Sequence, residues 1–327
     1  MAILAGDIGG TKTVLGIFEF AAQRLETVAE ATFAGGDHSS FDEVLAQFLE
    51  AHRAVELRAA CFGVAGPVID GRSNLLHLPW QLEEAELARA SGAARVVLIN
   101  DVEAAAYGML TLGDDERTVL NPGLPQPHAN IAVMAAGTGL GESFLCWDGE
   151  RYRASATEGG HASFAPRTDV QIELLRFLRD EFAGRVSTER LLSGPGLHNI
   201  YRFVRQRSSE AEPRPITERM AQEDPSAVIA ELALESRDVA CVESLELFAS
   251  IYGAEAGDIA LRYLALGGVF IGGGIAPKIL PALQTETFRS AFVDKGRYAE
   301  LVSGIPVFVS LEPRAPLLGA AHYALSL

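Results

Sequence analysis

The stretch that decides the fold of this chain is Ala5-Gly6-Asp7-Ile8-Gly9-Gly10-Thr11-Lys12-Thr13. Apolar runs on both sides, Ile3 to Ala5 and Val14 to Phe18, predict two strands joined by a glycine turn. Adjacent glycines permit positive φ and bring bare backbone close to a ligand, so the N–H groups of Gly9, Gly10 and Thr11 can point at a phosphate. Asp7 adds a carboxylate that can hold a metal-bound water. The alternative is an ordinary Gly-Gly hairpin in which Asp7 only favours the turn.

The composition is that of an acidic globular protein. The chain has 327 residues, of which 48% are hydrophobic and 21% charged, and its formal net charge is −16. This length suffices for two domains, and the negative charge argues against partners such as nucleic acid or an anionic membrane. An anionic ligand therefore needs a local site made of backbone amides, Mg²⁺ and helix ends.

The cysteines and the N-terminal segment indicate a cytoplasmic protein. Cys61, Cys146 and Cys241 are far apart and form no CxxC pair, which predicts reduced thiols and neither a disulfide framework nor a zinc site. We see no basic segment followed by an apolar one at the N-terminus, and no apolar run reaches the ~20 residues of a membrane span.

A second informative stretch is Asn100-Asp101. The apolar strand from Val96 to Ile99 stops abruptly there, and an alanine-rich helix is expected from Val102 to Leu110. Ligands of open α/β sheets bind beyond the carboxyl ends of strands, so Asp101 is placed to meet a substrate. The alternative is that Asp101 only caps the helix.

A second strand–glycine–strand unit follows. The strand from Asn130 to Ala136 leads into Gly137-Thr138-Gly139-Leu140-Gly141, and strand character resumes from Phe144 to Trp147. It repeats the first hairpin and predicts a second phosphate turn at Gly137, Thr138 and Gly139. The pattern is neither a Walker A motif nor a Rossmann fingerprint, because its spacing differs and a strand follows it.

Two polar stretches come next. Glu158 and His161 flank a glycine pair and can converge on one polar ligand; zinc is the lesser alternative, because no third ligand lies at suitable spacing. Ser187 or Thr188 is expected to cap a short helix that carries Glu189 in its first turn. A carboxylate is favoured at that place in any helix, so a capping role is the alternative for Glu189.

The third glycine stretch runs from Gly267 to Pro277. Its apolar centre predicts a strand, and Gly272, Gly273 and Gly274 then allow a flat ligand to lie against bare backbone. A helix that begins near Pro277 is expected to direct amide N–H groups at that ligand.

The other expected elements follow from periodicity and turn residues. The strands are expected at Leu25–Phe33, Ala59–Ala65 and Ile305–Leu311. The helices are expected at 41–52 with a cap at Ser39 or Ser40, at 82–91, at 171–182 and from Pro316 onward. The stretch 227–263 is expected to be largely helical, with Leu245, Phe248, Ile251 and Tyr252 in the core. Two stretches, 113–130 and 205–226, are expected to be a connection between domains and a surface loop.

Together, the three glycine stretches resemble the nucleotide-binding pattern shared by hexokinase, actin and the heat-shock ATPases. More narrowly, the chain resembles the bacterial glucokinase family over nearly its whole length. The stretches that carry this resemblance are Ile99-Asn100-Asp101, Glu158-Gly159-Gly160-His161 with Phe164-Ala165-Pro166, Glu189 to Gly196, and Gly267 to Pro277. The cysteine-rich zinc motif of the related ROK sugar kinases and repressors is absent, and we expect no N-terminal DNA-binding helix-turn-helix.

The resemblance implies an α/β protein with the two-domain actin-like ATPase (ribonuclease H-like) fold and a cleft between a small and a large domain. The small domain is expected to comprise residues 1–111 plus 303–327, and the large domain residues 112–302. The resemblance also implies a homodimer and an activity, the phosphorylation of D-glucose at its 6-hydroxyl by ATP.

The resemblance assigns roles to the candidate residues. The residues implied to hold the sugar hydroxyls are Asn100, Asp101, Glu158, His161 and Glu189. Asp101 is the implied catalytic base. The residues implied to bind the phosphates of ATP are Gly9-Gly10-Thr11 and Gly137-Thr138-Gly139. Those implied to border the adenosine are Gly272, Gly273 and Gly274. Mg²⁺ is implied with ATP, held by no direct side-chain ligand but in contact with Asp7 through water.

Four residues depart from the family pattern: Lys12 after the first turn, Val102 and Glu103 after Asp101, and Glu142 beside the second turn. Two alternative functions stay open. One is a kinase for fructose, mannose or an N-acetylhexosamine, and the other is a sugar-sensing regulator without turnover. The sequence also does not separate ATP from ADP or polyphosphate as the phosphoryl donor.

Overall fold

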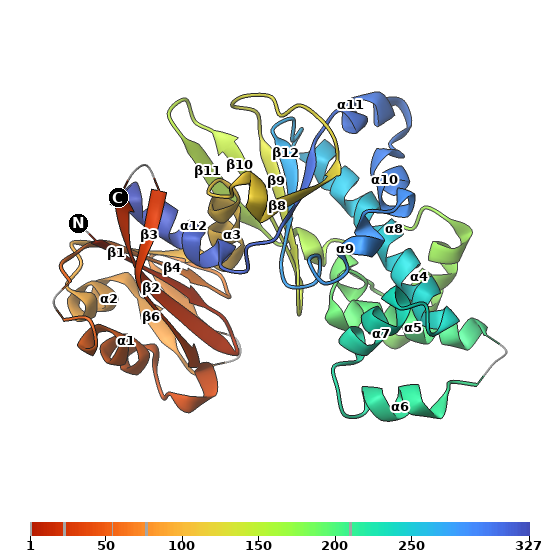
Figure 1. Cartoon of the computed structure of the whole chain (residues 1–327), viewed down its shortest axis with the longest axis horizontal. Coiled ribbons are helices and arrows are strands. Elements are labelled where there is room, and N and C mark those ends of the chain that lie inside the picture. The colour runs from red at the N-terminus through yellow and green to blue at the C-terminus, as the bar shows by residue number, and fades with distance from the viewer. Residues whose placement is uncertain (1, 22–23, 54, 76–77, 209–210) are drawn as a thin grey trace. The chain divides into compact units, whose positions relative to one another are not determined.

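The structure of the chain is a computed structural model that describes residues 2–21, 24–53, 55–75, 78–208 and 211–327 (Figure 1). The chain divides into two compact units. Unit 1 comprises Met1–Glu116, Ala154–Ala156 and Glu312–Leu327, and unit 2 comprises Arg117–Arg153 and Thr157–Leu311.

Unit 1 is built on a five-stranded sheet with the order β3-β2-β1-β4-β7. Its strands are β1 (Ala2–Ile8), β2 (Lys12–Ala21), β3 (Arg24–Ala34), β4 (Leu57–Val64) and β7 (Arg95–Asn100), and a separate hairpin pairs β5 (Arg72–Asn74) with β6 (Gln81–Glu83). β1 is antiparallel to β2 and parallel to β4, which is parallel to β7. The predicted hairpin, β1 and β2, and the strand predicted at Leu25–Phe33, which is β3, are thereby confirmed.

The helices of unit 1 cover both faces of this sheet (Figure 1). They are α1 (Phe41–Glu50), α2 (Glu84–Ser91), α3 (Asp101–Met109) and α12 (Ala315–Leu325), with short 3₁₀ turns η1 (Gly35–Asp37) and η2 (Asp114–Glu116). Neighbours on β4 show the two faces: the Phe62 ring packs edge-on against Phe41 of α1 at 5.4 Å, whereas Gly63 faces Ala104 of α3. Ser40 caps α1, as predicted, by accepting a hydrogen bond from the N–H of Glu43 at 3.3 Å.

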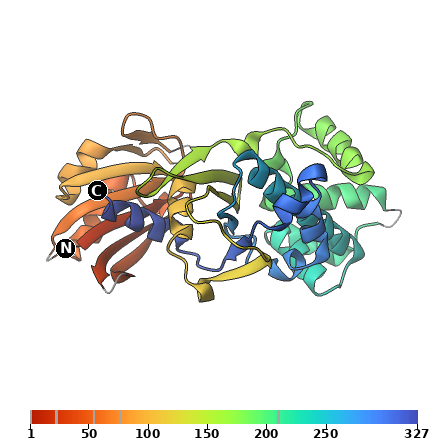
Figure 2. The same cartoon turned by 90° about the horizontal axis from the view of Figure 1, so that it is seen from above.

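The last helix, α12, packs on β1, β4 and α3, and Figure 2 shows it in dark blue along the red and orange strands. A methyl group added to Gly319 would lie 1.8 Å from the carbonyl oxygen of Ala104. Helices α3 and α12 therefore cross at a distance that only glycine permits.

Unit 2 repeats this design with a six-stranded sheet in the order β11-β10-β9-β12-β13-β8. The strands of this sheet are β8 (Arg117–Asn121), β9 (Ile131–Ala136), β10 (Leu140–Trp147), β11 (Tyr152–Thr157), β12 (Gly268–Gly272) and β13 (Val307–Ser310), and Ala154–Ala156 of β11 are the residues assigned to unit 1. β9 and β10 form the second predicted hairpin, and β12 lies parallel to both β9 and β13. The core of the sheet thus repeats the hairpin-plus-parallel-strands arrangement of unit 1.

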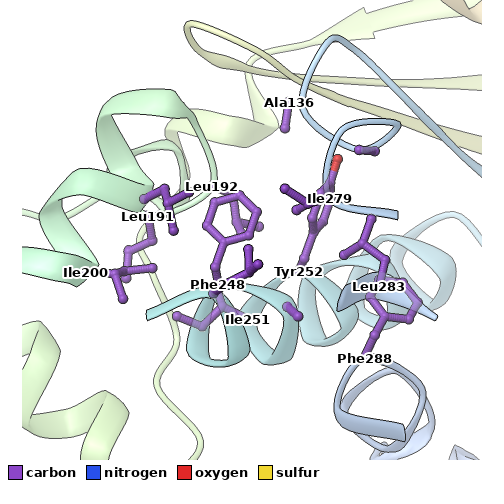
Figure 3. Packing of buried hydrophobic residues seen from close by; sticks show 14 of the residues in the cluster. Ala136, Leu191, Leu192, Ile200, Phe248, Ile251, Tyr252, Ile279, Leu283 and Phe288 are labelled. Carbon is purple, nitrogen blue, oxygen red and sulfur yellow. The ribbon is translucent and has the colours of Figure 1, made fainter. Parts of the chain in front are cut away.

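The helices of unit 2 enclose its larger core. They are α4 (Asp169–Glu181), α5 (Gly194–Arg207), α6 (Arg214–Met220), α7 (Pro225–Leu234), α8 (Val239–Arg262), α9 (Leu280–Leu283), α10 (Glu286–Val293) and α11 (Ala299–Ser303), with 3₁₀ turns η3 (Gly159–His161), η4 (Thr188–Arg190) and η5 (Gly296–Tyr298). The four core residues predicted on α8 are all buried. Figure 3 shows Phe248 facing Leu191 and Leu192, while Leu283 and Phe288 lie toward the other end of α8.

The structure corrects the predicted place of the strand near the C-terminus. We expected the strand at 305–311 to pack on the first domain, together with the last helix. Instead, β13 pairs with β12 and β8 inside the sheet of unit 2, and unit 1 resumes only at Glu312. The strand β8 was also not foreseen, because the three prolines of 113–130 indicated a connection only.

Two of the expectations for the helices of unit 2 were wrong. The expected loop at 205–226 contains α6 and the start of α7. The expectation that 227–263 is largely helical is confirmed by α7 and α8, between which the chain turns at Ser236, where φ is 54°. No helix begins at Pro277: the chain forms turns there, and α9 starts at Leu280 and has four residues. Across the described ranges, no helix has the length and apolar character needed to cross a membrane.

Candidate active site

The first glycine turn joins β1 and β2 through residues 9–12. The N–H of Gly9 donates to the carbonyl of Lys12 at 3.0 Å, so this amide closes the turn. We had predicted that it would point at a phosphate, and it does not. The φ angle of Gly9 is not in the positive range that glycine permits. In the described parts of the chain, no protein acceptor is found for the N–H groups of Gly10 and Thr11. These two amides, with the exposed Thr11 hydroxyl, are the donors that the turn offers.

Asp7 lies on β1, two residues before this turn, and is largely buried. Burial raises the pKa of its carboxyl group above the ordinary value, and the positive charge of the exposed Lys12 opposes that shift. Thr13, opposite Ile8 on β2, has a buried hydroxyl for which the described residues provide no hydrogen-bond partner. The buried Asp7 carboxyl group and Thr13 hydroxyl thus lie on the two strands that flank the turn, in addition to the polar groups of the turn itself.

Asn100, and not Asp101, caps α3. Its side-chain oxygen accepts from the N–H of Val102 at 2.9 Å, and Glu103 accepts from the N–H of Asn100 at 3.1 Å, which completes a capping box. The amide of Asn100 also donates to the carbonyl of Gly66 at 3.1 Å. The alternative in which Asp101 is only the cap is therefore wrong: Asp101 is the first residue of α3.

The sheet of unit 1 brings these groups to one edge. Ile8, Val64 and Asn100 are neighbours across the parallel strands β1, β4 and β7, so the three strands end at the same level. The glycine turn and Asp101 follow immediately after this level. The predicted position of Asp101, beyond the carboxyl end of a strand, is confirmed.

The second glycine turn, between β9 and β10, is one residue shorter. The N–H of Gly137 donates to the carbonyl of Gly139 at 2.9 Å, and the carbonyl of Gly137 accepts from the N–H of Gly194, the first residue of α5. Within the described residues, the N–H groups of Thr138 and Gly139 have no protein acceptor, and the side chain of Thr138 is exposed. This turn therefore also offers amides and a hydroxyl group.

The third glycine stretch reaches the same edge of the unit 2 sheet. Gly272 is opposite Ala135 across β12 and β9, and the N–H of Ile275 donates to the carbonyl of Ala136 at 3.3 Å. Gly273 has a φ of 82°, and a methyl group added to it would lie 2.3 Å from the carbonyl oxygen of Ala136. Only glycine fits this position. Because no helix begins at Pro277, the predicted N–H groups of a helix end are absent here.

Glu158, His161 and Glu189 come together in unit 2, although the sequence separates them by up to 31 residues. One imidazole nitrogen of His161, Nε2, lies 3.8 Å from Glu158, and the other, Nδ1, lies 3.8 Å from Glu189. The side chains of Glu158, His161 and Glu189 are 80%, 57% and 24% exposed, so the cluster faces solvent. Two carboxylates and an imidazole in this arrangement suit a ligand with several hydroxyl groups.

Glu189 also joins this cluster to the second glycine turn. Its carboxylate accepts a hydrogen bond from the N–H of Leu140 at 3.1 Å, and a methyl group on Gly139 would lie 2.6 Å from the same oxygen. The alternative of a capping role for Glu189 is thus wrong, because its carboxylate bonds a strand amide. Ser187, the residue before η4, makes no capping hydrogen bond either.

Glu142 is a buried acid that the sequence interpretation placed only near the phosphate turn. It is 1% exposed on β10 and faces Glu255, Asp258 and Arg262 of α8. Burial and the negative charge of Glu255 raise the pKa of Glu142 to about 7, although Arg262 opposes the shift. The period-two pattern of a strand could have shown its burial, because Glu142 shares a face with the buried Leu140.

The zinc alternative has no support in the described part of the chain, where no group of three His, Cys, Asp or Glu side chains is arranged to hold a metal ion.

Comparisons with known proteins place these groups in context. A family model described as Glucokinase matches residues 4–327. A glucokinase from Nostoc punctiforme is 40% identical over 332 residues, which cover 98% of this chain and 97% of that protein. The crystal structure of a glucokinase from an Antarctic psychrotroph is 31% identical, covers 100% of this chain and 99% of that one, and superposes with a TM-score of 0.88.

A more distant structure shares the fold. A ROK family glucokinase from Streptomyces griseus, solved in complex with glucose and AMPPNP, is 22% identical, covers 100% of both chains and has a TM-score of 0.66. These likenesses confirm the predicted fold class, the actin-like ATPase fold.

Proposed function

The chain belongs to the glucokinase family, and we propose that it transfers the γ-phosphoryl group of ATP to the 6-hydroxyl group of D-glucose. The observation that carries this proposal is the joining of Glu189 to both His161 and the Gly137–Gly139 turn. A sugar bound by Glu189 would lie beside the turn whose amides are available to bind a phosphate.

The proposed glucose ligands are the residues that the family resemblance implies: Asn100, Asp101, Glu158, His161 and Glu189. Carboxylates accept hydrogen bonds from sugar hydroxyls, and imidazole and amide groups can donate or accept. Asn100 contributes with its orientation already fixed, because capping α3 and bonding to Gly66 hold its side chain in one position.

Asp101 is the proposed general base. Its carboxylate would accept the proton of the 6-hydroxyl as that oxygen forms a bond to the γ-phosphorus and the bond from phosphorus to ADP breaks. Asp101 is half-buried at the first position of α3, with Oδ1 accepting from the N–H of Val102 at 2.9 Å. The helix N-terminus favours the charged form that a base needs.

The two glycine turns are the proposed phosphate sites. The donors are the amides of Gly10, Thr11, Thr138 and Gly139 with the two threonine hydroxyls, while Gly9 and Gly137 act by closing the turns. Such fixed donors stabilise charge that develops during phosphoryl transfer. We propose that Gly272, Gly273 and Gly274 border the adenosine, since Gly273 brings bare backbone to the end of β9.

Asp7 fits the proposed contact with Mg²⁺ through water. Burial disfavours its charged form, and a neighbouring cation would restore that form. The buried hydroxyl of Thr13 is a further oxygen near the same turn. When bound with ATP, Mg²⁺ would supply positive charge to the phosphates.

We further propose that the enzyme is cytoplasmic and a homodimer. The reduced cysteines support the first: Cys61, Cys146 and Cys241 are all free thiols. The family resemblance supports the second. Light scattering of the purified full-length chain tests the dimer.

A coupled assay with ATP, Mg²⁺ and a panel of hexoses tests the main proposal. We expect glucose to give the highest kcat/KM and glucose 6-phosphate as the product. Higher kcat/KM with fructose, mannose or an N-acetylhexosamine would replace the substrate but keep the chemistry. Tight glucose binding without turnover would favour a sugar-sensing regulator. ADP and polyphosphate in place of ATP test the donor.

A further inference from the structure

The side chain of Glu142 lies directly beneath the turn that carries Glu158 and His161. A methyl group added to Gly159 would be 2.1 Å from an Oε atom of Glu142 and 2.9 Å from its carboxyl carbon. Such a position is open only because residue 159 is glycine. The carboxyl group of Glu142 therefore touches the backbone of the turn η3 itself.

The backbone of Glu142 holds the same turn from a second side. Its carbonyl oxygen accepts a hydrogen bond from the hydroxyl of Thr157 at 3.0 Å, and that hydroxyl accepts from the N–H of Gly159 at 3.1 Å. Gly159 is thus fixed between the carboxyl group of Glu142 and the hydroxyl of Thr157. A small movement of the Glu142 side chain must move Gly159, because interiors are closely packed.

Glu142 belongs to a group of three carboxylates and two cations. The other two acids are Glu255 and Asp258, and the cations are Arg262 and Lys295. Arg262 contacts Glu255 at 2.6 Å, and Lys295 contacts Asp258 at 2.6 Å. Glu142 has only a longer approach to Arg262, at 3.8 Å, and one of its oxygens is buried without a partner among the described residues. Of the three acids, Glu142 is the least compensated.

The charged groups that face Glu142 come from α8: Glu255, Asp258 and Arg262. The turn and β11 face it with the uncharged groups of Gly159 and Thr157. Burial and the nearby acids bring the pKa of Glu142 to about 7, so its charge changes within the physiological range.

We propose that Glu142 is a positioning residue for sugar binding, and that gain or loss of its proton moves the Glu158–His161 turn through Gly159. The carboxyl group rests against Gly159 in the observed arrangement, which the protonated form would keep. The ionised group is drawn toward Arg262, which Glu255 already occupies, and this movement displaces the support of the turn. Raising the pH therefore weakens glucose binding. This inference rests on the proposed function only in that the turn is taken to hold glucose.

The first test compares the pH dependence of KM for glucose in the full-length wild type and in Glu142→Gln. The glutamine has the shape of the protonated acid and cannot ionise. In the wild type we expect KM for glucose to rise about threefold or more between pH ~6 and ~8, with KM for ATP changing less. Glu142→Gln should lose that rise, while any contribution of His161 remains in both proteins. The matched control is Glu150→Gln, an exposed acid of the β10–β11 turn, which should behave as the wild type.

The second test needs no turnover. The amide NMR resonances of Gly159 and Gly160 should titrate in the wild type with a midpoint near pH ~7 and should stay constant in Glu142→Gln. Arg262→Gln removes the charge that holds the pKa of Glu142 down, so its midpoint should move to higher pH.

The outcomes separate the two proposals. Glycine resonances that do not titrate, or an equal pH dependence of KM in the wild type and in Glu142→Gln, would overturn the positioning role while glucose phosphorylation stands. Titrating resonances in a protein that phosphorylates no hexose would support the positioning of the turn and reject the proposed function.

Discussion

The two glycine turns, 9–12 in unit 1 and 137–139 in unit 2, occupy the same place in two similar sheets but have different surroundings. Each follows the first strand of an antiparallel hairpin, and each lies at the carboxyl end of parallel strands. Each turn also uses its first amide to close itself, on Lys12 in one and on Gly139 in the other.

The difference lies in what each sheet brings to its turn. In unit 1, β7 is separated from β1 by β4 and ends at Asn100, and Asp101, the proposed base, follows it. In unit 2 the neighbour is a carboxylate from a distant turn, Glu189, and a buried acid, Glu142, follows two residues after Leu140. Under the proposed function, the same kind of hairpin would lie beside the base in one unit and beside a sugar ligand in the other. Substitution of Asp101 should act on kcat, substitutions at the first glycine turn on KM for ATP, and those around Glu189 on KM for glucose.

The strongest test of this division is Asp101→Asn. The amide keeps the shape of the side chain but cannot accept the proton, so kcat should fall by about 10²–10⁴-fold. Glucose binding, measured by calorimetry, should change far less. Asp42→Asn in the first turn of α1, an exposed acid, is the control. Full activity of Asp101→Asn would reject Asp101 as the base.

The next prediction concerns the free energy of unfolding and its dependence on the protonation of Glu142, the buried acid of unit 2. The pKa of Glu142 in the folded chain, about 7, lies above its ordinary value of 4.5. The folded chain then binds this proton more tightly than the unfolded chain, so stability from this group is present at low pH and is lost as the pH rises from ~4.5 through ~7. The free energy of unfolding should fall by up to ~3 kcal/mol across this window through Glu142 alone.

Urea unfolding of the wild type and Glu142→Gln at pH ~5.5 and ~8.5 measures this loss. The variant should lack it and be the more stable of the two at the higher pH. A wild type whose stability changes no more than that of Glu142→Gln would show that Glu142 titrates normally. Glu150→Gln is again the matched control.

A third prediction compares one glycine from each turn, Gly139 and Gly9. A methyl group on Gly139 would meet the Glu189 carboxylate at 2.6 Å, whereas one on Gly9 would meet the Lys12 carbonyl at 3.1 Å. Gly139→Ala should break the bond from Leu140 to Glu189 and raise KM for glucose about tenfold, in line with ~1.5 kcal/mol for a charged hydrogen bond. Gly9→Ala should act chiefly on KM for ATP.

Gly36→Ala is the control for this pair, because a methyl group there meets nothing within 4 Å. If Gly139→Ala changed KM for ATP and left KM for glucose untouched, the link between Glu189 and the sugar cluster would carry no function.

The smallest effect is expected for Lys12→Ala. Lys12 is exposed, and an exposed charge contributes little because solvent and salt screen it. KM for ATP should rise by no more than about threefold, and the rise should shrink as salt is added. A much larger loss would mean that Lys12 contacts phosphate directly.

Much of the fold was predictable because local signals agree with it. The glycine pairs between apolar runs, the cap at Ser40 and the proline at the start of the last helix each specify backbone geometry within a few residues. The signals failed where neighbours in space decide. Proline-rich 113–130 holds β8 only because β13 offers it a partner, and the Pro277 segment forms turns although its sequence suits a helix start.

The sequence by itself determined the two glycine hairpins, the place of Asp101 after a buried strand, and the family pattern that names the candidate residues. Those features are local, or they lie in a fixed order along the chain. Only the tertiary structure decided that Asn100 caps α3, that Glu189 bonds the Leu140 amide, and that Glu142 lies beneath Gly159 among the charges of α8. Partners of this kind are far apart in sequence, and burial sets their charge, so no local pattern encodes them.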